Sequence, residues 1–156
     1  MTKNINISTL NLTFTKLVGN QSPVFLSVID DEVELAYLFK DALSQIDEIQ
    51  VFAFSDPKLA LEHFQLNRQQ YQVVITDHRM PGMAGIELLD KIKAINPAVT
   101  RILMSAFEIQ EEQFQECNCV DKFLQKPILM SKIINEVRML ITNTARQEPQ
   151  ILTPDF

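Results

Sequence analysis

Glycine is scarce in this sequence, and its scarcity excludes several ways of binding a nucleotide. Only Gly19, Gly82 and Gly85 occur among the 156 residues. Neither the G-x-G-x-x-G turn of dinucleotide-binding folds nor a P-loop can be formed from glycines at these positions. The G-x-S-x-G elbow of serine hydrolases is also absent. The sequence therefore argues against a nucleotide-binding enzyme and against a hydrolase of that type.

Cysteine is equally rare. Cys117 and Cys119 are the only two cysteines, which is too few for a framework of disulfide bonds. A structural zinc site needs four ligands, and the two histidines, His63 and His78, lie far from this pair in the sequence. We therefore expect free thiols, buried or half-exposed, and no zinc site.

Positive charge and long apolar runs are lacking as well. Fourteen basic residues stand against twenty acidic ones, for a net charge of −6, which argues against a surface that binds nucleic acid or an anionic membrane. No apolar run approaches the roughly 20 residues that a transmembrane helix needs. The N-terminus lacks the basic-then-apolar layout of a signal peptide. We expect a cytoplasmic protein that binds neither nucleic acid nor membrane.

The residues that are present predict an alternation of strands and helices. Hydrophobic residues make up 46% of the chain, enough for the core of one domain. Short apolar runs bounded by turn residues predict strands, and apolar residues at helical spacing predict helices. The strands are expected at 24–29, 49–54, 73–77, 101–105 and 120–124, and the helices at 33–46, 57–66, 85–95, 109–116 and 129–142. Five strands alternating with five helices imply a parallel sheet covered on both faces, a doubly wound α/β fold.

The two ends of the chain fall outside this pattern. Residues 1–22 alternate apolar residues with polar ones around Leu10, Leu12 and Phe14, which fits either a strand or a loosely ordered tail. Residues 143–156 carry two prolines and no periodicity. We therefore divide the chain into an N-terminal extension at 1–22, one domain at 23–142, and a tail or the start of a linker at 143–156.

Polar side chains that can carry out chemistry stand at the ends of four predicted strands. The carboxyl ends of the strands are where ligands bind in an open parallel sheet. These ends supply three carboxylates, one hydroxyl and one ammonium, from Asp30, Asp31, Asp77, Ser105 and Lys126. Crowded carboxylates repel one another unless a cation neutralises them, and Mg²⁺ prefers oxygen ligands of this kind. The sequence therefore predicts a magnesium site at this edge of the sheet.

Each of these residues also has an ordinary structural interpretation when it is taken alone. Asp30 and Asp31 can cap a helix, and Asp77 can be a turn residue ahead of the Pro-Gly pair at 81–82. Lys126, which precedes a proline, can simply end a strand, and Ser105 alone indicates nothing. Their occurrence together, in order and each at a predicted strand end, is what favours a functional site.

This set of residues resembles the receiver domain of two-component response regulators, over roughly residues 23–142. The motifs that carry the resemblance are Val-Ile-Asp-Asp-Glu at 28–32, Asp77 followed by Met-Pro-Gly-Met-Ala-Gly at 80–85, Ser-Ala at 105–106, and Lys-Pro at 126–127 preceded by Phe123. The resemblance implies a flavodoxin-like (βα)5 fold with a five-stranded sheet in the order 2-1-3-4-5. It also implies a signalling module rather than an enzyme that turns over a separate substrate.

The resemblance implies a role for each acidic residue. Asp77 accepts a phosphoryl group from the histidine of a sensor histidine kinase or of a histidine phosphotransfer protein. Asp31 and Asp77 ligate Mg²⁺ together with the backbone carbonyl of Arg79, and Asp30 acts largely through water. Phosphoryl transfer requires alignment and charge neutralisation more than covalent machinery, and these groups are suited to both.

The resemblance also implies how phosphorylation of Asp77 changes the surface of the domain. Lys126 pairs with the phosphoryl oxygens, Ser105 hydrogen-bonds to them, and Phe123 changes its packing when Ser105 moves. The result is a two-state surface made by the fourth strand, the short fourth helix and the fifth strand. We expect this surface to bind a downstream protein, and a homodimer is left open. No output domain is visible, so the output comes through protein contacts or through a domain beyond these residues.

Three positions depart from the family pattern, and one alternative function stays open. Ala84 stands where the family usually has an acidic residue, Ser105 stands where threonine is commoner, and Arg79 is bulky and cationic. Arg79 could cover the phosphoryl group and slow attack by water, or recruit the donor. It also occupies the position where a haloacid-type phosphatase needs a second aspartate. The alternative is an interaction module that keeps the receiver fold and signals without phosphate.

Overall fold

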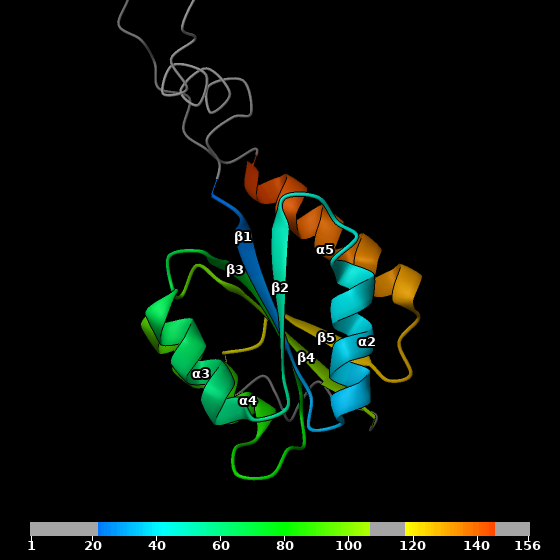
Figure 1. Cartoon of the computed structure of the whole chain (residues 1–156). Helices are drawn as coiled ribbons and strands as arrows, with labels where there is room; N and C mark the ends of the chain where they lie inside the picture. The colour runs from blue at the N-terminus through cyan, green and yellow to red at the C-terminus, as the bar shows by residue number, and fades with distance from the viewer. Residues whose placement is uncertain (1–21, 107–117, 146–156) are drawn as a thin grey trace, which may run out of the picture.

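The computed structural model describes residues 22–106 and 118–145, and within these ranges it has five strands and four helices (Figure 1). In chain order they are β1 (Val24–Ile29), α2 (Val33–Leu43), β2 (Ile49–Phe54), α3 (Pro57–Leu66), β3 (Tyr71–Asp77), α4 (Gly85–Ile95), β4 (Thr100–Ser105), β5 (Lys122–Gln125) and α5 (Met130–Ala145). The predicted helix at 109–116 and the region 1–21, where the strand-or-tail question arises, lie outside the described residues.

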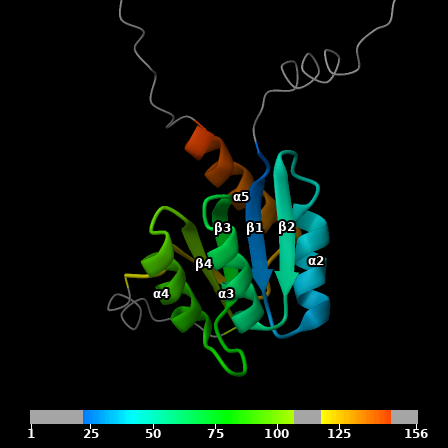
Figure 2. The same cartoon turned by 60° about the vertical axis from the view of Figure 1, so that its left-hand side comes forward.

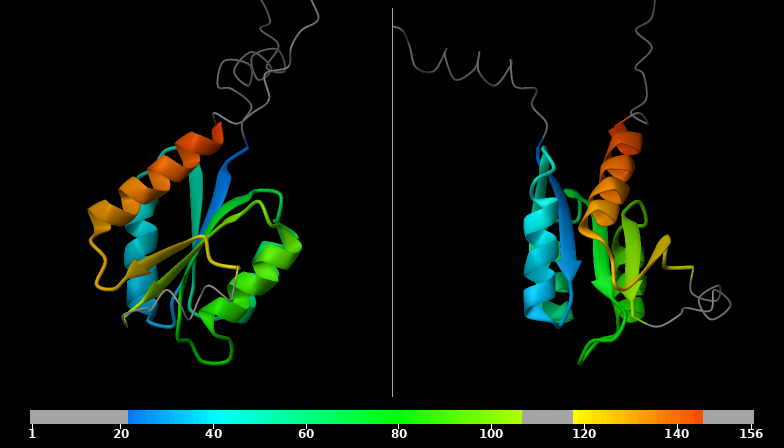
Figure 3. Two further views of the ribbon diagram at one scale, coloured as in Figure 1. Left: turned by 180° about the vertical axis from the view of Figure 1, so that it is seen from behind. Right: turned by 90° about the vertical axis from the view of Figure 1, so that its right-hand side faces the viewer.

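The five strands form one parallel sheet in the order β2-β1-β3-β4-β5, which confirms the expected order. Helices α3 and α4 cover one face of the sheet, and α2 and α5 cover the other (Figures 1 and 2). The start of β1 and the end of α5 lie at the end of the domain opposite to the carboxyl ends of the strands (Figure 3). The edge where the site is expected is therefore remote from both chain ends of the domain.

Two buried clusters hold the helices on the sheet. Leu88, Leu89 and Ile92 of α4 pack with Phe64 of α3 on one face. Phe39 of α2 packs on the other face, in a buried cluster that includes Leu43, Ile75, Ile102, Met104, Ile133 and Val137. The central strands contribute to both clusters because their alternate side chains point to opposite faces. Burial on both faces is why these strands occur in the sequence as nearly continuous apolar runs.

The N-terminus of α3 is capped in the way that the sequence predicts. The carboxylate of Asp56 accepts a hydrogen bond of 2.8 Å from the backbone N–H of Lys58, and Pro57 occupies the first turn. A proline there sacrifices no helical hydrogen bond, since the first N–H groups of a helix have no partner within it. The predicted start of this helix is confirmed.

Other boundaries differ from the prediction for physical reasons. Helix α2 ends at Leu43 rather than 46. Ser44 is its C-cap, with its N–H and its hydroxyl both donating to the carbonyl of Lys40, and the N–H of Ile46 donates to the carbonyl of Leu43 in the turn that follows. Strand β5 begins at Lys122 rather than 120, because Val120 packs against the core from the preceding loop. An apolar residue of a loop can thus contact the core without belonging to a strand. None of the helices in the described ranges is long and apolar enough to cross a membrane.

The prediction of free thiols is wrong for Cys119. This residue is disulfide-bonded, and its partner lies outside the described residues. Cys119 itself is buried, and its sulfur lies 3.8 Å from the carbonyl oxygen of Ile86. Two cysteines are too few for a framework of several bridges, but they suffice for a single bond.

His63 of α3 lies in an aromatic environment beneath the helix. Its Nδ1 is 2.8 Å from the hydroxyl of Tyr71, and its ring centroid is 4.3 Å from that of Phe52 and 5.5 Å from that of Phe54. Burial lowers the pKa of His63 below its usual value of 6.5. The neutral imidazole is therefore the form that the folded protein favours.

This environment predicts a loss of stability in mild acid. A lowered pKa in the folded state contributes stability that is present above the unfolded pKa and is lost as the pH falls through the folded pKa. We expect the free energy of unfolding to fall between about pH 7.5 and pH 5.5, and to fall less in His63→Gln. Urea unfolding at both pH values measures this difference, and Glu62→Gln, at an exposed position of the same helix, serves as the control. An equal pH dependence in His63→Gln and the parent protein would contradict it.

Candidate functional site

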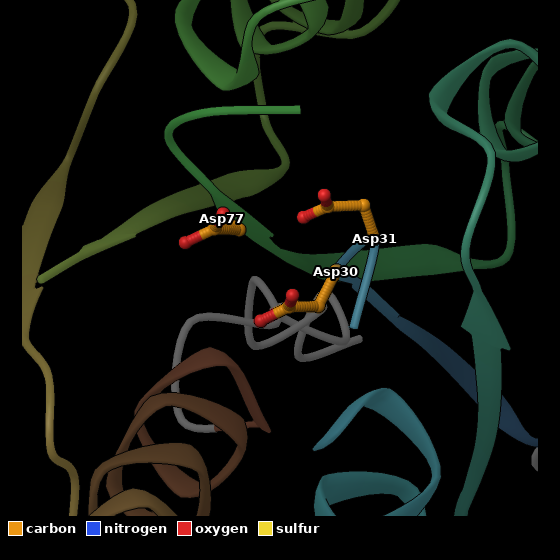
Figure 4. Close-up of side chains that lie close together, drawn as sticks. All are labelled: Asp30, Asp31 and Asp77. Atoms are coloured by element: carbon orange, nitrogen blue, oxygen red, sulfur yellow. The ribbon is translucent and has the colours of Figure 1, made fainter. Parts of the chain in front are cut away.

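Three carboxylates gather where β1 and β3 end (Figure 4). Asp30 and Asp31 directly follow β1, and Asp77 is the last residue of the adjacent β3. One oxygen from each lies within 4.8 Å of the others. Asp30 is fully buried, Asp77 is half-buried, and Asp31 is exposed. The cluster therefore has a closed side at Asp30 and an open side at Asp31.

Backbone hydrogen bonds fix the position of Asp30. Its N–H donates to the carbonyl of Phe54 at 3.1 Å, which ties it to the neighbouring strand β2. Its Oδ1 accepts a hydrogen bond of 3.0 Å from the N–H of Glu32, just ahead of α2. One oxygen of the buried carboxylate, Oδ1, therefore has a backbone donor, and the other, Oδ2, contacts Lys126.

Lys126 closes the site from the β5 side. Its Nζ lies 2.6 Å from Asp30 Oδ2 and 2.9 Å from Asp77 Oδ1, and its side chain is only 14% exposed. Its backbone N–H donates to the carbonyl of Ser105 at 2.7 Å, which anchors it beside the end of β4. One ammonium thus bridges two acids that lie far apart in the sequence.

The pKa of Lys126 reflects this position. Burial by itself lowers the pKa of the ammonium, but the hydrogen bonds to Asp30 and Asp77, and their charges, act in the opposite direction and raise it overall. Lys126 therefore stays charged at neutral pH. Its single positive charge still leaves a cluster of three carboxylates with an excess of negative charge.

Ser105 and Phe123 lie on neighbouring strands near this edge. Ser105 is buried at the end of β4. Phe123 of β5 pairs with Leu103, two residues before Ser105, and packs half-buried against the core on the α3/α4 face. Residues two apart on a strand share a face, so Ser105 and Phe123 are directed to the same side of the sheet.

Arg79 is exposed, in the segment between β3 and α4. The preceding residue, His78, is held by a hydrogen bond from its N–H to the carbonyl of Met104 at 2.9 Å. Burial lowers the pKa of His78, the charge of Arg79 lowers it further, and the charge of Asp77 opposes both. The charge of Arg79 is therefore close enough to act on the residue that follows Asp77.

The donor set fits a hard divalent cation. The residues offer three carboxylates on rigid strand ends, with one side open at Asp31. Oxygen ligands of this kind, together with water, are what Mg²⁺ binds in proteins. Asp30, Asp31 and Asp77 would hold the ion, which would supply charge neutralisation next to Asp77.

Two further residues contact the acceptor's backbone and have no role in the site predicted from the sequence. Thr76 is fully buried, and its hydroxyl lies 3.0 Å from the carbonyl oxygen of Asp77. Gly85 begins α4 against the same carbonyl group. A polar residue inside an otherwise apolar strand was the available sign for Thr76, whereas nothing in the sequence places Gly85 against Asp77.

Comparison with known proteins identifies the group to which this arrangement is similar. A family model described as the response regulator receiver domain matches residues 26–138. Response regulator RppA of a Synechocystis strain is 24% identical over 127 residues, which cover 81% of this chain and 54% of that protein. The hydrogenase transcriptional regulatory protein HoxA of Cupriavidus necator is 27% identical over 116 residues, which cover 73% of this chain and 23% of that protein.

Solved structures give the same result. A response regulator receiver domain protein from Clostridium thermocellum has a TM-score of 0.70 and 25% identity, with coverage of 80% of this chain and 99% of that one. The receiver domain of the Francisella response regulator 1452 has a TM-score of 0.66 and 28% identity, with coverage of 78% and 98%. By contrast, the chain spans only about a fifth to half of the length of the curated relatives it matches.

Proposed function

Because the chain belongs to the response regulator receiver domain family, a family of signalling modules and not of turnover enzymes, we propose that Asp77 is its phosphoryl acceptor. The observation that carries the proposal is the contact of Lys126 Nζ with both Asp30 and Asp77, at 2.6 and 2.9 Å, beside an open carboxylate cluster. The proposed donor is the phosphohistidine of a sensor histidine kinase or of a histidine phosphotransfer protein.

In the proposed transfer, an oxygen of Asp77 forms the new bond to phosphorus as the phosphorus–nitrogen bond of the donor breaks. The donor imidazole takes up a proton as it leaves. Lys126 donates hydrogen bonds to the phosphoryl oxygens, and Asp30 keeps that ammonium in place. Asp31, Asp77 and the backbone carbonyl of Arg79 would hold Mg²⁺, with Asp30 acting largely through water, and the ion would supply neutralisation of the phosphoryl charge.

The proposed response begins at Ser105. A phosphoryl group adds about −1.5 to −2 charges at neutral pH, and the Ser105 hydroxyl is a donor on the adjacent strand end. When Ser105 moves toward the phosphoryl group, Phe123 repacks on the same side of the sheet. The altered surface binds a downstream protein or a second copy of the chain, in the cytoplasm.

Intact-mass measurement tests whether Asp77 is the phosphoryl acceptor. Incubation with a small phosphodonor and Mg²⁺ is expected to add the mass of one phosphoryl group to the parent protein and none to Asp77→Asn. Asp41→Asn, an exposed aspartate on α2, is the matched control and is expected to be modified like the parent. No mass gain in the parent, under conditions that modify a control receiver, would overturn the proposal and favour an interaction module that signals without phosphate.

Arg79 is expected to lengthen the life of the aspartyl phosphate. The side chain is exposed and lies two residues past the acceptor, where a cation can cover the phosphoryl group and obstruct water. Replacing it with alanine is expected to shorten the half-life of the phosphate by about threefold, measured as loss of the added mass over time. Arg79→Lys, which keeps the charge, is the control. An unchanged half-life in Arg79→Ala would refute this role.

A further inference from the structure

We propose that Thr76 and Gly85 are positioning residues that lock the peptide group between Asp77 and His78, and that this lock directs the acceptor carboxylate toward Lys126. The inference rests on the proposed role of Asp77 and extends it to two residues that do not touch the reacting atoms. It is carried by three contacts made to one peptide group by three different parts of the fold.

The first contact comes from Thr76. Its side chain is fully buried, and its Oγ1 lies 3.0 Å from the carbonyl oxygen of Asp77 and 3.9 Å from the sulfur of Met80. A buried hydroxyl that makes no hydrogen bond is costly, so its proton is directed to one of these acceptors. Thr76 therefore links the acceptor's main chain to the segment that follows it.

The second contact comes from the first residue of α4. A β-carbon at Gly85 would lie 2.1 Å from the carbonyl oxygen of Asp77 and 3.0 Å from its carbonyl carbon. Only a residue without a side chain allows this approach. The N–H of Gly85 also donates to the carbonyl of His78 at 2.9 Å. The start of α4 thus packs directly against the backbone of Asp77.

The third contact holds the other side of the same peptide group. The N–H of His78 donates to the carbonyl of Met104 on β4 at 2.9 Å. The carbonyl of the Asp77–His78 peptide lies within hydrogen-bond distance of Thr76 Oγ1 and packs against Gly85, and its N–H donates to β4. A peptide unit is planar, so fixing both of its polar groups fixes its tilt.

The tilt of this peptide controls where the Asp77 carboxylate points. The side chain leaves the α-carbon that carries the locked carbonyl, and its Oδ1 lies 2.9 Å from Lys126 Nζ. A displacement of about 1 Å at reacting groups can cost about 100-fold in rate. The lock therefore acts on the rate of phosphoryl transfer and on metal binding, separately from its part in stability.

Substitutions at Thr76 separate positioning from stability. Thr76→Val keeps the shape and β-branching but removes the hydroxyl, and we expect a phosphorylation rate about tenfold lower and a higher Mg²⁺ concentration for half-maximal rate, with little change in thermal stability. Thr76→Ser restores the hydroxyl and is expected to recover most of the rate. A Thr76→Val rate equal to that of the parent would overturn the proposal.

Substitutions at two glycines provide a matched pair. Gly85→Ala forces a β-carbon against Asp77 and is expected to lower the phosphorylation rate by about 100-fold. Gly82→Ala places the same group where its closest neighbour is Lys58 Cε at 4.0 Å, although the positive φ of Gly82 makes that variant less stable. If both variants lose rate in proportion to their loss of stability, the lock is refuted.

A crystal structure of Thr76→Val distinguishes failure of the lock from failure of the proposed function. If the parent protein accepts no phosphoryl group, Asp77 is not the acceptor, and the lock is judged by the distance from Lys126 Nζ to Asp77 Oδ1. A carboxylate displaced from Lys126 supports the lock, and a carboxylate still in hydrogen-bond contact overturns it.

Discussion

Replacing Lys126 with methionine is expected to lower the free energy of unfolding by about 3–5 kcal/mol in metal-free buffer. The ammonium contacts the fully buried Asp30 at 2.6 Å and Asp77 at 2.9 Å. Methionine fills similar space but leaves both carboxylates without their counter-charge, and removing one partner of a buried pair is strongly destabilising. Guanidinium chloride unfolding at neutral pH, with a chelator present, measures the change.

Mg²⁺ is expected to restore part of that stability. The three-carboxylate cluster that Lys126 partly neutralises is the proposed metal site, so its removal leaves more negative charge for a cation to bind. Added Mg²⁺ should therefore raise the unfolding midpoint more in Lys126→Met than in the parent protein. An equal Mg²⁺ effect in the two proteins would show that Lys126 does not influence the metal site.

Lys122 provides the control for these experiments. It is a partly exposed lysine that pairs with Glu136 between β5 and α5, away from the carboxylate cluster. Lys122→Met is expected to cost about 1 kcal/mol or less, as exposed pairs do, and to leave the Mg²⁺ response unchanged. If Lys126→Met loses no more stability than Lys122→Met, the bridge between Asp30 and Asp77 has little energetic importance.

The architecture was predictable because its strands are buried on both faces. Such strands occur as short, nearly continuous apolar runs, and each run here is followed by turn or polar residues. The sheet order β2-β1-β3-β4-β5 came from the resemblance to a family and not from periodicity, which cannot order strands. The gathering of Asp30, Asp31 and Asp77 followed from the order of the strands once their carboxyl ends were identified.

The parts that were not predictable depend on distances between residues remote in sequence. Periodicity does not reveal that the α-carbon of Gly85 rests on the carbonyl of Asp77. It also gives the same apolar pattern for Val120, which packs from a loop, as for a strand residue. In each case, packing between elements decided the outcome and local preference did not.

The burial of Arg101 is another feature that the sequence does not predict, since a charged residue at the start of a strand suggests an exposed side chain. Its side chain is instead only 6% exposed. The guanidinium donates to the carbonyls of Cys119 at 2.8 Å, Val99 at 2.9 Å and Pro97 at 3.1 Å, and to Asp121 Oδ1 at 3.0 Å. Its backbone N–H donates to the other oxygen of Asp121 at 2.7 Å. One residue therefore ties the loop before β4 to the segment that leads into β5.

Arg101→Met is expected to lower the free energy of unfolding by about 3 kcal/mol, because it leaves several buried carbonyl groups without their donor. Arg101→Lys should lose nearly as much, since an ammonium cannot reproduce the planar fork of the guanidinium. Lys91→Met, which removes an exposed pair with Glu87 on α4, is expected to cost about 0.5 kcal/mol or less. Guanidinium chloride unfolding compares all three variants at neutral pH. Arg101 also holds the segment that leads into β5, the strand that precedes Lys126. We therefore expect faster amide hydrogen exchange over residues 119–125 in Arg101→Met than in the parent protein, and equal exchange rates there would contradict this role of Arg101.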